Sequence, residues 1–161
     1  MRKLLFLLIL VLVAYFAWRW WRGADGDASA DRGQELLYDR LWVDHLPASQ
    51  TDTFSIFAAI TEQPMGVFDH RSQWKGDWEL FRHEGRGDGQ MELMFPQSKQ
   101  KSRASYRAWK CNEKKDFDFC LEISASKGPK KYFSQRGWEI GSIEGARSAE
   151  ARLLSAAPAE R

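Results

Sequence analysis

The first segment of the chain, residues 4–21, is an almost unbroken apolar run that a small water-soluble core cannot accommodate. Arg19 is its one charged residue. As an α-helix the run would be roughly 27 Å long, about the thickness of the hydrocarbon layer of a bilayer. Because such a helix satisfies its own backbone hydrogen bonds, the sequence predicts a transmembrane signal anchor over residues 1–22.

The end of this run is typical of a membrane interface. Tryptophan rings prefer the headgroup region, and arginine side chains can extend from the apolar layer to reach it. We therefore expect five residues to form a membrane-interface belt: Trp18, Arg19, Trp20, Trp21 and Arg22.

A cleaved signal peptide is the alternative interpretation. Arg2 and Lys3 would form its basic start, and Ala28-Ser29-Ala30 fits the small-x-small rule for cleavage after Ala30, which would release a secreted domain. The arginines and tryptophans between the apolar run and that cleavage site favour the retained anchor. Residues 23–30, small and polar, are expected to form a flexible linker.

The remaining segment is electrically balanced. The whole chain has 24 basic and 22 acidic residues; the first 30 residues hold four of the basic and two of the acidic side chains, so the rest carries 20 of each. A nucleic-acid-binding domain would need a basic surface, so we expect no nucleic-acid partner.

An amphipathic helix is predicted directly after the linker, over residues 31–47. Asp31 and Gln34 resemble a helix-capping box, and Pro47 is a stop signal. Between them, apolar and aromatic residues fall on one helical stripe: Leu37, Tyr38, Leu41, Trp42 and His45.

Residues 48–145 have the pattern of a β-rich domain, in which short strands alternate with polar turns. Residues 54–60 fit a buried strand, although Phe54, Phe57 and Ala58 also fit a helix. Further strands are expected over 67–68, 78–82, 91–95, 103–111, 117–124, 131–134 and 138–143. Strands at this spacing predict an antiparallel meander that forms a small barrel or a half-open sandwich. Residues 146–161 are expected to be a short helix, over 150–154, and a frayed tail.

Cys111 and Cys120 flank the polar turn at residues 112–116. If the hairpin is centred on that turn, the two cysteines face each other directly, and Ala108 faces Ile123. Cysteines facing each other on antiparallel strands are close enough to bridge, and an even cysteine number in an exported chain favours a disulfide. Two reduced thiols in a cytosolic domain are the alternative.

The membrane topology is decided by this pair, since the charges are nearly balanced across the apolar run: Arg2 and Lys3 precede it, and Arg19, Arg22 and Arg32 follow it. A disulfide requires an oxidising compartment. We therefore expect a single-pass protein of the inner (plasma) membrane with its domain on the extracytoplasmic side.

Sequence signatures of catalysis are missing. The chain has no nucleophile elbow, no phosphate-binding glycine loop and no zinc-binding HExxH spacing. Each of the three histidines, His45, His70 and His83, is next to a carboxylate in the sequence. Adjacent residues on a strand point to opposite faces, so these neighbours do not form a site by themselves. We therefore expect no cofactor, no metal and no enzymatic activity.

Trp78, Trp109 and Trp138 are the candidate ligand-binding residues, because aromatic side chains line many lipid and sugar sites. Gly76-Asp77-Trp78 resembles the Gly-x-Trp signature on the first strand of lipocalins. The resemblance covers these three residues, and the segment from Trp78 to Ile143 is too short for a full eight-stranded lipocalin barrel.

Three functions are compatible with these observations. The first is a non-catalytic binding or assembly domain of the cell envelope, tethered by one span and acting on an envelope protein partner. The second is a carrier of a lipid or another small apolar ligand, built as a lipocalin-like small barrel. The third, ranked last, is an envelope hydrolase that uses carboxylates such as Glu79, Glu92 or Glu122.

Overall fold

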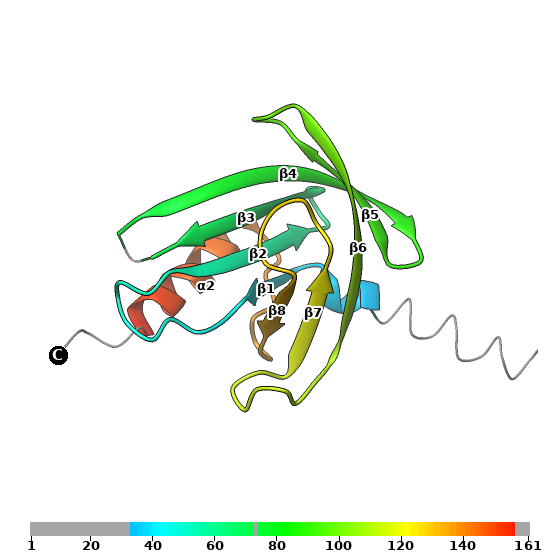
Figure 1. Cartoon of the computed structure of the whole chain (residues 1–161). Helices are drawn as coiled ribbons and strands as arrows, with labels where there is room; N and C mark the ends of the chain where they lie inside the picture. Colours follow the sequence, from blue (N-terminus) through cyan, green and yellow to red (C-terminus); the bar gives the residue numbers. More distant parts are fainter. Residues whose placement is uncertain (1–32, 73, 157–161) are drawn as a thin grey trace, which may run out of the picture. The chain divides into compact units, whose positions relative to one another are not determined.

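Eight antiparallel strands form a closed barrel in which each strand pairs with the next along the chain and the last pairs with the first (Figure 1). The computed structural model describes residues 33–72 and 74–156. The bounds of the elements are β1 Arg40–Val43, β2 Phe54–Ile60, β3 Met65–Arg71, β4 Gly76–Gly87, β5 Gln90–Phe95, β6 Gln100–Lys110, β7 Phe119–Ile123, β8 Lys131–Ser134 and α2 Ile143–Ala156. The predicted antiparallel barrel is confirmed.

The barrel closes through a short contact between β1 and β8. Val43 pairs with Phe133, and an isolated bridge joins Arg40 to Glu139. A 2.7 Å ion pair between the Arg40 guanidinium and the Glu139 carboxylate reinforces that bridge. The strand predicted over 138–143 is therefore wrong except for this bridge at Glu139, and α2 already begins at Ile143.

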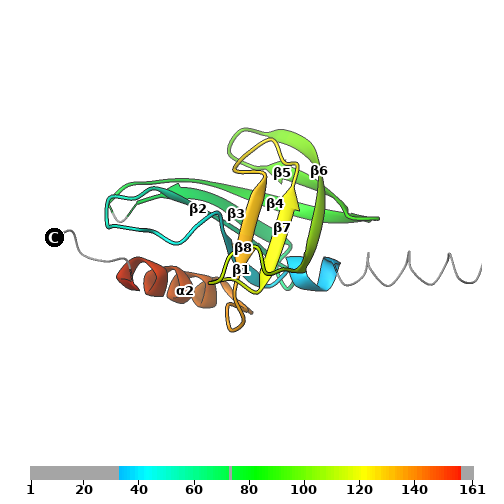
Figure 2. The same cartoon turned by 60° about the horizontal axis from the view of Figure 1, so that its bottom comes forward.

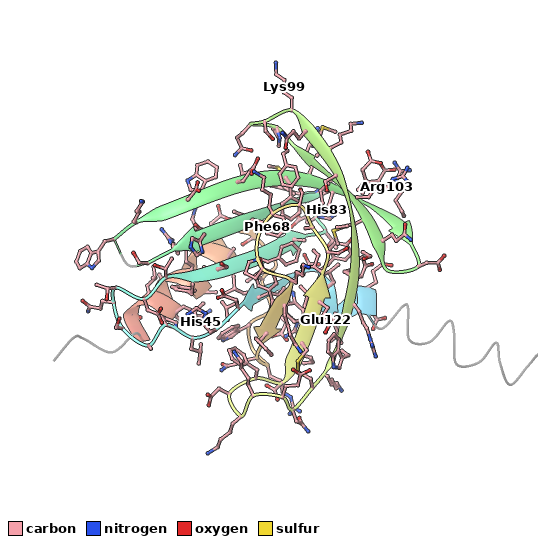
Figure 3. All side chains as sticks on the ribbon, viewed as in Figure 1. His45, Phe68, His83, Lys99, Arg103 and Glu122 are labelled. Atoms are coloured by element: carbon pink, nitrogen blue, oxygen red, sulfur yellow. A yellow bond between two sulfur atoms is a disulfide. The ribbon has the colours of Figure 1, made fainter. Side chains whose placement is uncertain are left out.

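Aromatic and aliphatic side chains fill the interior of the barrel. Phe57 lies at its centre, with ring centroids 5.1 Å from Phe68, 5.7 Å from Phe81 and 5.8 Å from Tyr132. Figure 3 shows Phe68 within the ring of strands and Lys99 at the outer tip of the β5–β6 hairpin. The interior is thus a hydrophobic core of buried side chains in mutual contact.

A second apolar cluster lies on the outer side of the barrel wall, where α2 covers it. Leu41, Ile56 and Ala58 contribute from the strands, and Ala149 and Leu153 contribute from α2. Both views show α2 alongside the wall and outside the ring of strands (Figures 1 and 2). Because β2 has one face in the barrel core and the other under α2, all seven of its residues are buried. This explains its continuous apolar sequence. Of the two structures that fit residues 54–60, the strand is confirmed and the helix is not.

The helix predicted over residues 31–47 is wrong beyond its first turns. Residues 33–37 are helical, but Asp39 has a φ of 53°, in the left-handed region that ends a right-handed helix. The Asp39 carboxylate accepts a hydrogen bond from the backbone of Thr61 at 2.8 Å. From Arg40 the chain continues as strand β1 and pairs with β2. The barrel therefore begins before residue 48, its expected start, because strand pairing outweighs the helical pattern.

The disulfide between Cys111 and Cys120 is confirmed, but the predicted register of its hairpin is wrong. Cys120 pairs with Trp109, and Tyr106 pairs with Ile123, so the strands are shifted by two residues from a direct cysteine pair. Cys111 follows the end of β6 and bridges diagonally, with the two Cα atoms 5.6 Å apart. Because side-chain direction repeats every two residues, the shift keeps each residue on its expected face.

The remaining differences concern where elements begin and end. α2 spans Ile143–Ala156, much longer than the helix predicted over 150–154. It is capped at its start by Ser142, whose hydroxyl accepts a hydrogen bond from the Gly145 amide at 3.1 Å. At the β4–β5 turn, Asp88 and Gly89 both have positive φ, as this hairpin type requires.

The predicted anchor over 1–22, its interface residues Trp18, Arg19, Trp20, Trp21 and Arg22, and the linker over 23–30 lie outside the described residues. In the part of the chain that is described, no helix combines the length and apolar character that crossing a membrane requires.

Candidate functional site

A groove between α2 and the outer face of β2, β3 and β4 is the best candidate for a binding site. Its volume is about 420 Å³, within the range of small-molecule sites. Mostly apolar side chains line it, with four charged ones: Leu41, Ile56, Ala58, Ile60, Met65, Val67, Asp69, Arg71, Trp78, Leu80, Ala146, Arg147 and Glu150, together with Gly66. We call it the α2 groove.

Strand β3 forms the floor of the α2 groove through its outward-facing residues. Met65, Val67, Asp69 and Arg71 follow one another at two-residue intervals, so their side chains lie on one face. The other side chains of β3 point inward, as Phe68 does. β3 is therefore apolar on both faces in its first half and charged on its outer face in the second half.

Charged groups from β3 and α2 meet at one end of the groove. The Arg71 guanidinium lies 3.4 Å from the Asp69 carboxylate and forms a second ion pair with Glu150 of α2. Asp69 Oδ1 is buried and accepts no hydrogen bond. Burial raises the pKa of Asp69 above its usual value, although the Arg71 charge opposes this shift. The groove thus combines an apolar section with a polar end that holds an unsatisfied acceptor.

The three candidate tryptophans do not meet in one pocket. Trp78 lines the α2 groove and is 58% exposed. Trp109 lies on the outer face of β6, with the Arg107 guanidinium 5.1 Å from its ring. Trp138 packs edge-on against Phe117, with centroids 6.1 Å apart. Of the three, Trp78 is the one that lines the α2 groove.

The Gly-x-Trp motif does not stand on the strand where lipocalins carry it. Gly76 and Trp78 lie on β4, not on the first strand, and three strands precede them. The barrel nevertheless has eight strands, because β1, β2 and β3 supply those that the segment after Trp78 cannot. Side chains such as Trp42, Phe57 and Phe81 occupy the interior and are fully buried, so the space where a lipocalin holds its ligand is filled.

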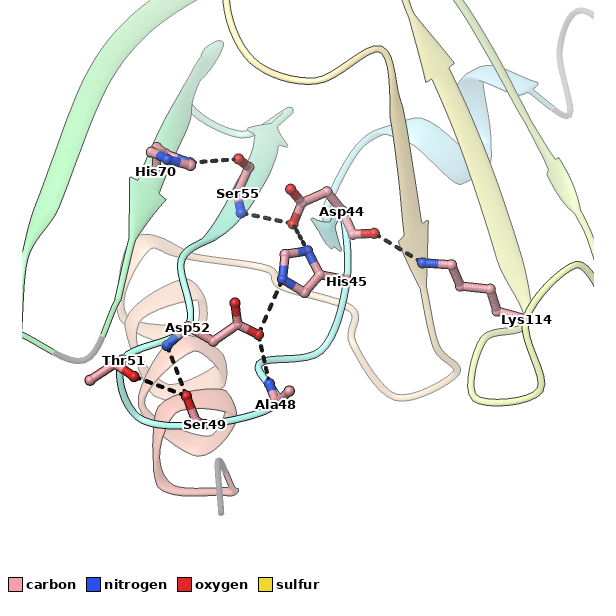
Figure 4. Close-up of polar contacts among 9 residues, drawn as sticks. All are labelled: Asp44, His45, Ala48, Ser49, Thr51, Asp52, Ser55, His70 and Lys114. Carbon is pink, nitrogen blue, oxygen red and sulfur yellow. Dashed lines mark hydrogen bonds and ion pairs between the residues drawn. The ribbon is translucent and has the colours of Figure 1, made fainter. Parts of the chain in front are cut away.

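A polar network joins β1, β2 and β3 at one end of the barrel (Figure 4). The Ser55 amide donates to Asp44 at 2.8 Å, and the Ser55 hydroxyl lies 3.0 Å from His70 Nδ1. His45 contacts the carboxylates of both Asp44, at 3.0 Å, and Asp52, at 3.4 Å. Asp52 also accepts from the backbone of residue 48, and this bond is the main reason that its pKa is lowered.

This network does not have the arrangement of a hydrolase site. Ser55 is buried, at 4% exposure, so its hydroxyl is not presented to a substrate. Among the described residues, Ser55 is the hydrogen-bonding partner of His70, and no carboxylate orients that imidazole in the way a catalytic triad requires. The network connects three strands and thereby stabilises the end of the barrel. No group of three metal-ligating side chains occurs in the described part of the chain.

The candidate carboxylates do not converge. Glu79 pairs with Lys127 at 2.9 Å, Glu92 with Arg86 at 2.8 Å, and Glu122 with Lys131 at 3.9 Å. Each of the three carboxylates thus pairs with a different basic residue. Hydrogen bonding from Arg86 lowers the pKa of Glu92, which is opposite to what a general acid needs.

Sequence reasoning missed all four charged residues of the groove, Asp69, Arg71, Arg147 and Glu150. One signal was available, since Met65 and Val67 alternate with Gly66 and Phe68, so the first half of β3 is apolar on both faces. A strand of that kind needs a cover on each side. The cover is α2, whose length the sequence underestimates.

Comparison with known protein families, with curated proteins and with solved structures gives no match to this chain.

Proposed function

We propose that this chain is a non-catalytic binding or assembly domain of the cell envelope, tethered to the inner membrane by one span. The apolar run over 4–21 supports the tether. The Cys111–Cys120 disulfide supports an extracytoplasmic position for the domain, because disulfides persist in oxidising compartments. The α2 groove is the proposed binding site.

One observation carries this proposal. The α2 groove is a concave, largely apolar surface with a few charged groups at one end, and Trp78 stands partly exposed at its edge. Apolar surface that remains accessible on a folded domain commonly marks a site where another molecule binds. The separate, paired carboxylates offer no comparable support for catalysis.

The carrier of a small apolar ligand is the second candidate. The filled interior of the barrel counts against a ligand held inside it, as in lipocalins. A carrier would have to use the α2 groove, whose 420 Å³ is sufficient for a small ligand. Both candidates therefore place binding at the same groove and differ in what occupies it.

Site-specific photo-crosslinking in membranes tests the proposed site. A photoreactive amino acid replaces Val67, which is half-buried in the groove, in the full-length chain. Arg103, an exposed residue on β6 that does not line the groove, receives the same replacement as a control. We expect cross-linked products from position 67 that are missing from position 103. Identical products at both positions, or none at position 67, would overturn the proposed site.

A further inference from the structure

Strand β6 carries a row of basic and polar side chains on the outside of the barrel. Ala104, Tyr106 and Ala108 belong to the core, so the residues that alternate with them face outward. In chain order the outward residues are Lys101, Arg103, Ser105, Arg107 and Trp109. A hollow of about 550 Å³ lies beside the middle of this row, lined by residues of β6, β7 and β8. We call the outer side of β6, together with this hollow, the β6 face.

The β6 face has an excess of positive charge. Glu92 and Glu122 lie opposite the row on β5 and β7, and Glu113 reaches it from the β6–β7 turn by pairing with Lys131. Against these three acidic residues stand five basic ones: Lys101, Arg103, Arg107, Lys130 and Lys131. Because residues 31–161 hold 20 charges of each sign, the positive excess here leaves the remainder of that segment negative.

Two of these basic side chains have no anionic partner. Lys131 pairs with both Glu113 and Glu122. Within residues 33–72 and 74–156, Arg107 and Lys130 form no ion pair, although both line the hollow and both are exposed. An anionic group placed in the hollow would therefore gain two charge pairs without breaking one.

Serine hydroxyls complete the lining of the hollow. Ser105 Oγ and Ser124 Oγ are 2.6 Å apart, and both residues are exposed. Hydroxyl groups beside an arginine and a lysine are the donors that phosphate oxygens accept from in proteins. The hollow thus has the chemistry of a site for a phosphate group.

The chain enters the described domain beside β6. A Cβ atom built on Gly33, the first described residue, would lie 3.5 Å from the Ala108 carbonyl oxygen of β6. Residues 23–32, which separate Gly33 from the predicted anchor, extend over at most about 35 Å. A bilayer that holds the anchor would therefore be within reach of the β6 face.

We propose that the β6 face docks the domain on a bilayer that contains anionic phospholipids, with phosphate headgroups at Arg107 and Lys130. This inference rests on the tether of the proposed function. Two unpaired basic side chains attract an anionic surface only weakly. The tether compensates for this weakness, because it gives the face a high effective concentration at the bilayer.

Docking through β6 would leave the α2 groove open to a partner. In the ring of eight strands, β7 lies opposite β3, which forms the floor of the groove. Figures 1 and 2 show β6 across the barrel from α2. The β7–β8 loop also turns away from the β6 face, since Lys127 pairs with Glu79 of β4 at 2.9 Å. One wall of the barrel would thus contact the membrane while the opposite wall binds.

Fluorescence quenching by lipid tests the docking in the full-length chain reconstituted in vesicles. Ser105→Cys on the β6 face and Ser148→Cys, exposed on α2, form a matched pair that each carry a bimane fluorophore. Part of the phospholipid carries a headgroup nitroxide, which quenches bimane on contact. In vesicles rich in phosphatidylglycerol, we expect strong quenching at position 105 and little at position 148. The difference should disappear in pure phosphatidylcholine and at high salt, which screens the attraction.

Charge reversal identifies the basic side chains responsible. Arg107→Glu combined with Lys130→Glu should lower the ratio of docked to undocked domain at least about tenfold, as the loss of two charges near an anionic surface predicts. Arg82→Glu combined with Arg152→Glu makes the same change in net charge at exposed positions outside the β6 face. We expect this control to alter the quenching at position 105 much less.

The outcomes separate this inference from the tether on which it rests. Flotation with the vesicles after a high-salt wash reports the tether, because charge attraction does not survive that wash. If the chain floats but positions 105 and 148 are quenched equally, or the two double variants behave alike, the docking is wrong and the tether stands. If soluble polyphosphate alters the bimane signal at position 105 while the bilayer does not, the face binds a soluble polyanion and the docking is likewise wrong. If the chain does not float, both proposals fail.

Discussion

At the scale of the residue, Gly66 shows how tightly the wall and the core of the barrel fit together. A Cβ atom built there would lie 2.2 Å from the Phe81 ring and 2.3 Å from the backbone oxygen of Ala58. The backbone oxygen cannot move away without breaking the sheet. We expect Gly66→Ala to lower the free energy of unfolding by about 2–3 kcal/mol, as overpacking does.

Gly85 is the matched control for Gly66, because it lies on β4, and a Cβ atom there meets only the Tyr38 hydroxyl, at 3.9 Å. Gly85→Ala should leave stability nearly unchanged. Denaturant unfolding of both variants in the full-length chain checks this prediction. Equal effects of the two substitutions would contradict the close packing at Gly66.

Tyr132 and Ser134 are buried hydroxyl residues on β8 that differ in hydrogen bonding. The Ser134 hydroxyl donates to the Leu41 carbonyl at 2.7 Å, whereas the Tyr132 hydroxyl has no partner among the described residues. Removing a buried hydroxyl that lacks a partner should not destabilise the fold, while removing a bonded one leaves a carbonyl unsatisfied. We expect Tyr132→Phe to match or exceed the wild-type stability and Ser134→Ala to lose about 1 kcal/mol, measured by thermal unfolding.

His83 should make stability depend on pH. Burial lowers the pKa of His83 from 6.5, while a hydrogen bond to the Ile60 carbonyl partly opposes the shift. Between the lowered pKa and 6.5, the unfolded chain binds a proton that the folded chain does not. The stabilisation is thus fully present above 6.5 and is lost as the pH falls toward the lowered value.

The loss of stability at low pH should be small, because His83 is only partly buried. Unfolding measured between about pH 7 and about pH 5 should show a smaller decline for His83→Gln than for the wild type. An identical decline in both proteins would show that other groups are responsible.

At the scale of the element, strands with simple alternation were predictable and elements that depend on distant partners were not. β5, predicted over 91–95, spans Gln90–Phe95, because its buried side chains alternate with more exposed ones. Arg40–Val43 has a helical pattern, but its partner Phe54–Ile60 holds it as a strand. The predicted hairpin register failed because the turn between the paired residues Lys110 and Phe119 is centred one residue earlier than a direct Cys111–Cys120 pair requires. The resulting shift of two residues leaves the alternation of faces unchanged, so the sequence pattern could not reveal it.

The Cys111–Cys120 disulfide should contribute about 2–3 kcal/mol to stability, the value typical of a short closed loop. Replacing both cysteines with alanine should lower the free energy of unfolding by this amount, and reducing the wild type should lower it similarly. The reductant should have no effect on the double variant. If the reductant lowered the free energy of unfolding of the double variant as much as that of the wild type, the disulfide would not be the stabilising element.

At the scale of the whole molecule, the barrel was predictable and the groove was not. Short strands separated by polar turns indicate a meander, and the packed interior closes it. The α2 groove depends on a helix that follows the last strand and returns to cover β2 and β3. Its contacts join residues far apart in the sequence, as Arg71 and Glu150 are, so no local pattern reveals them.

We propose that this barrel is held on the outer side of a membrane, and labelling of an introduced cysteine tests that position most directly. Ser126, exposed in the β7–β8 loop, is replaced by cysteine in the full-length chain, and intact cells are treated with a membrane-impermeant maleimide before membranes are separated. The native cysteines are bonded to each other and should not react. We expect labelled protein in the membrane fraction without lysis. Labelling only after lysis would contradict the outward orientation, and labelled protein in the soluble fraction would contradict the tether.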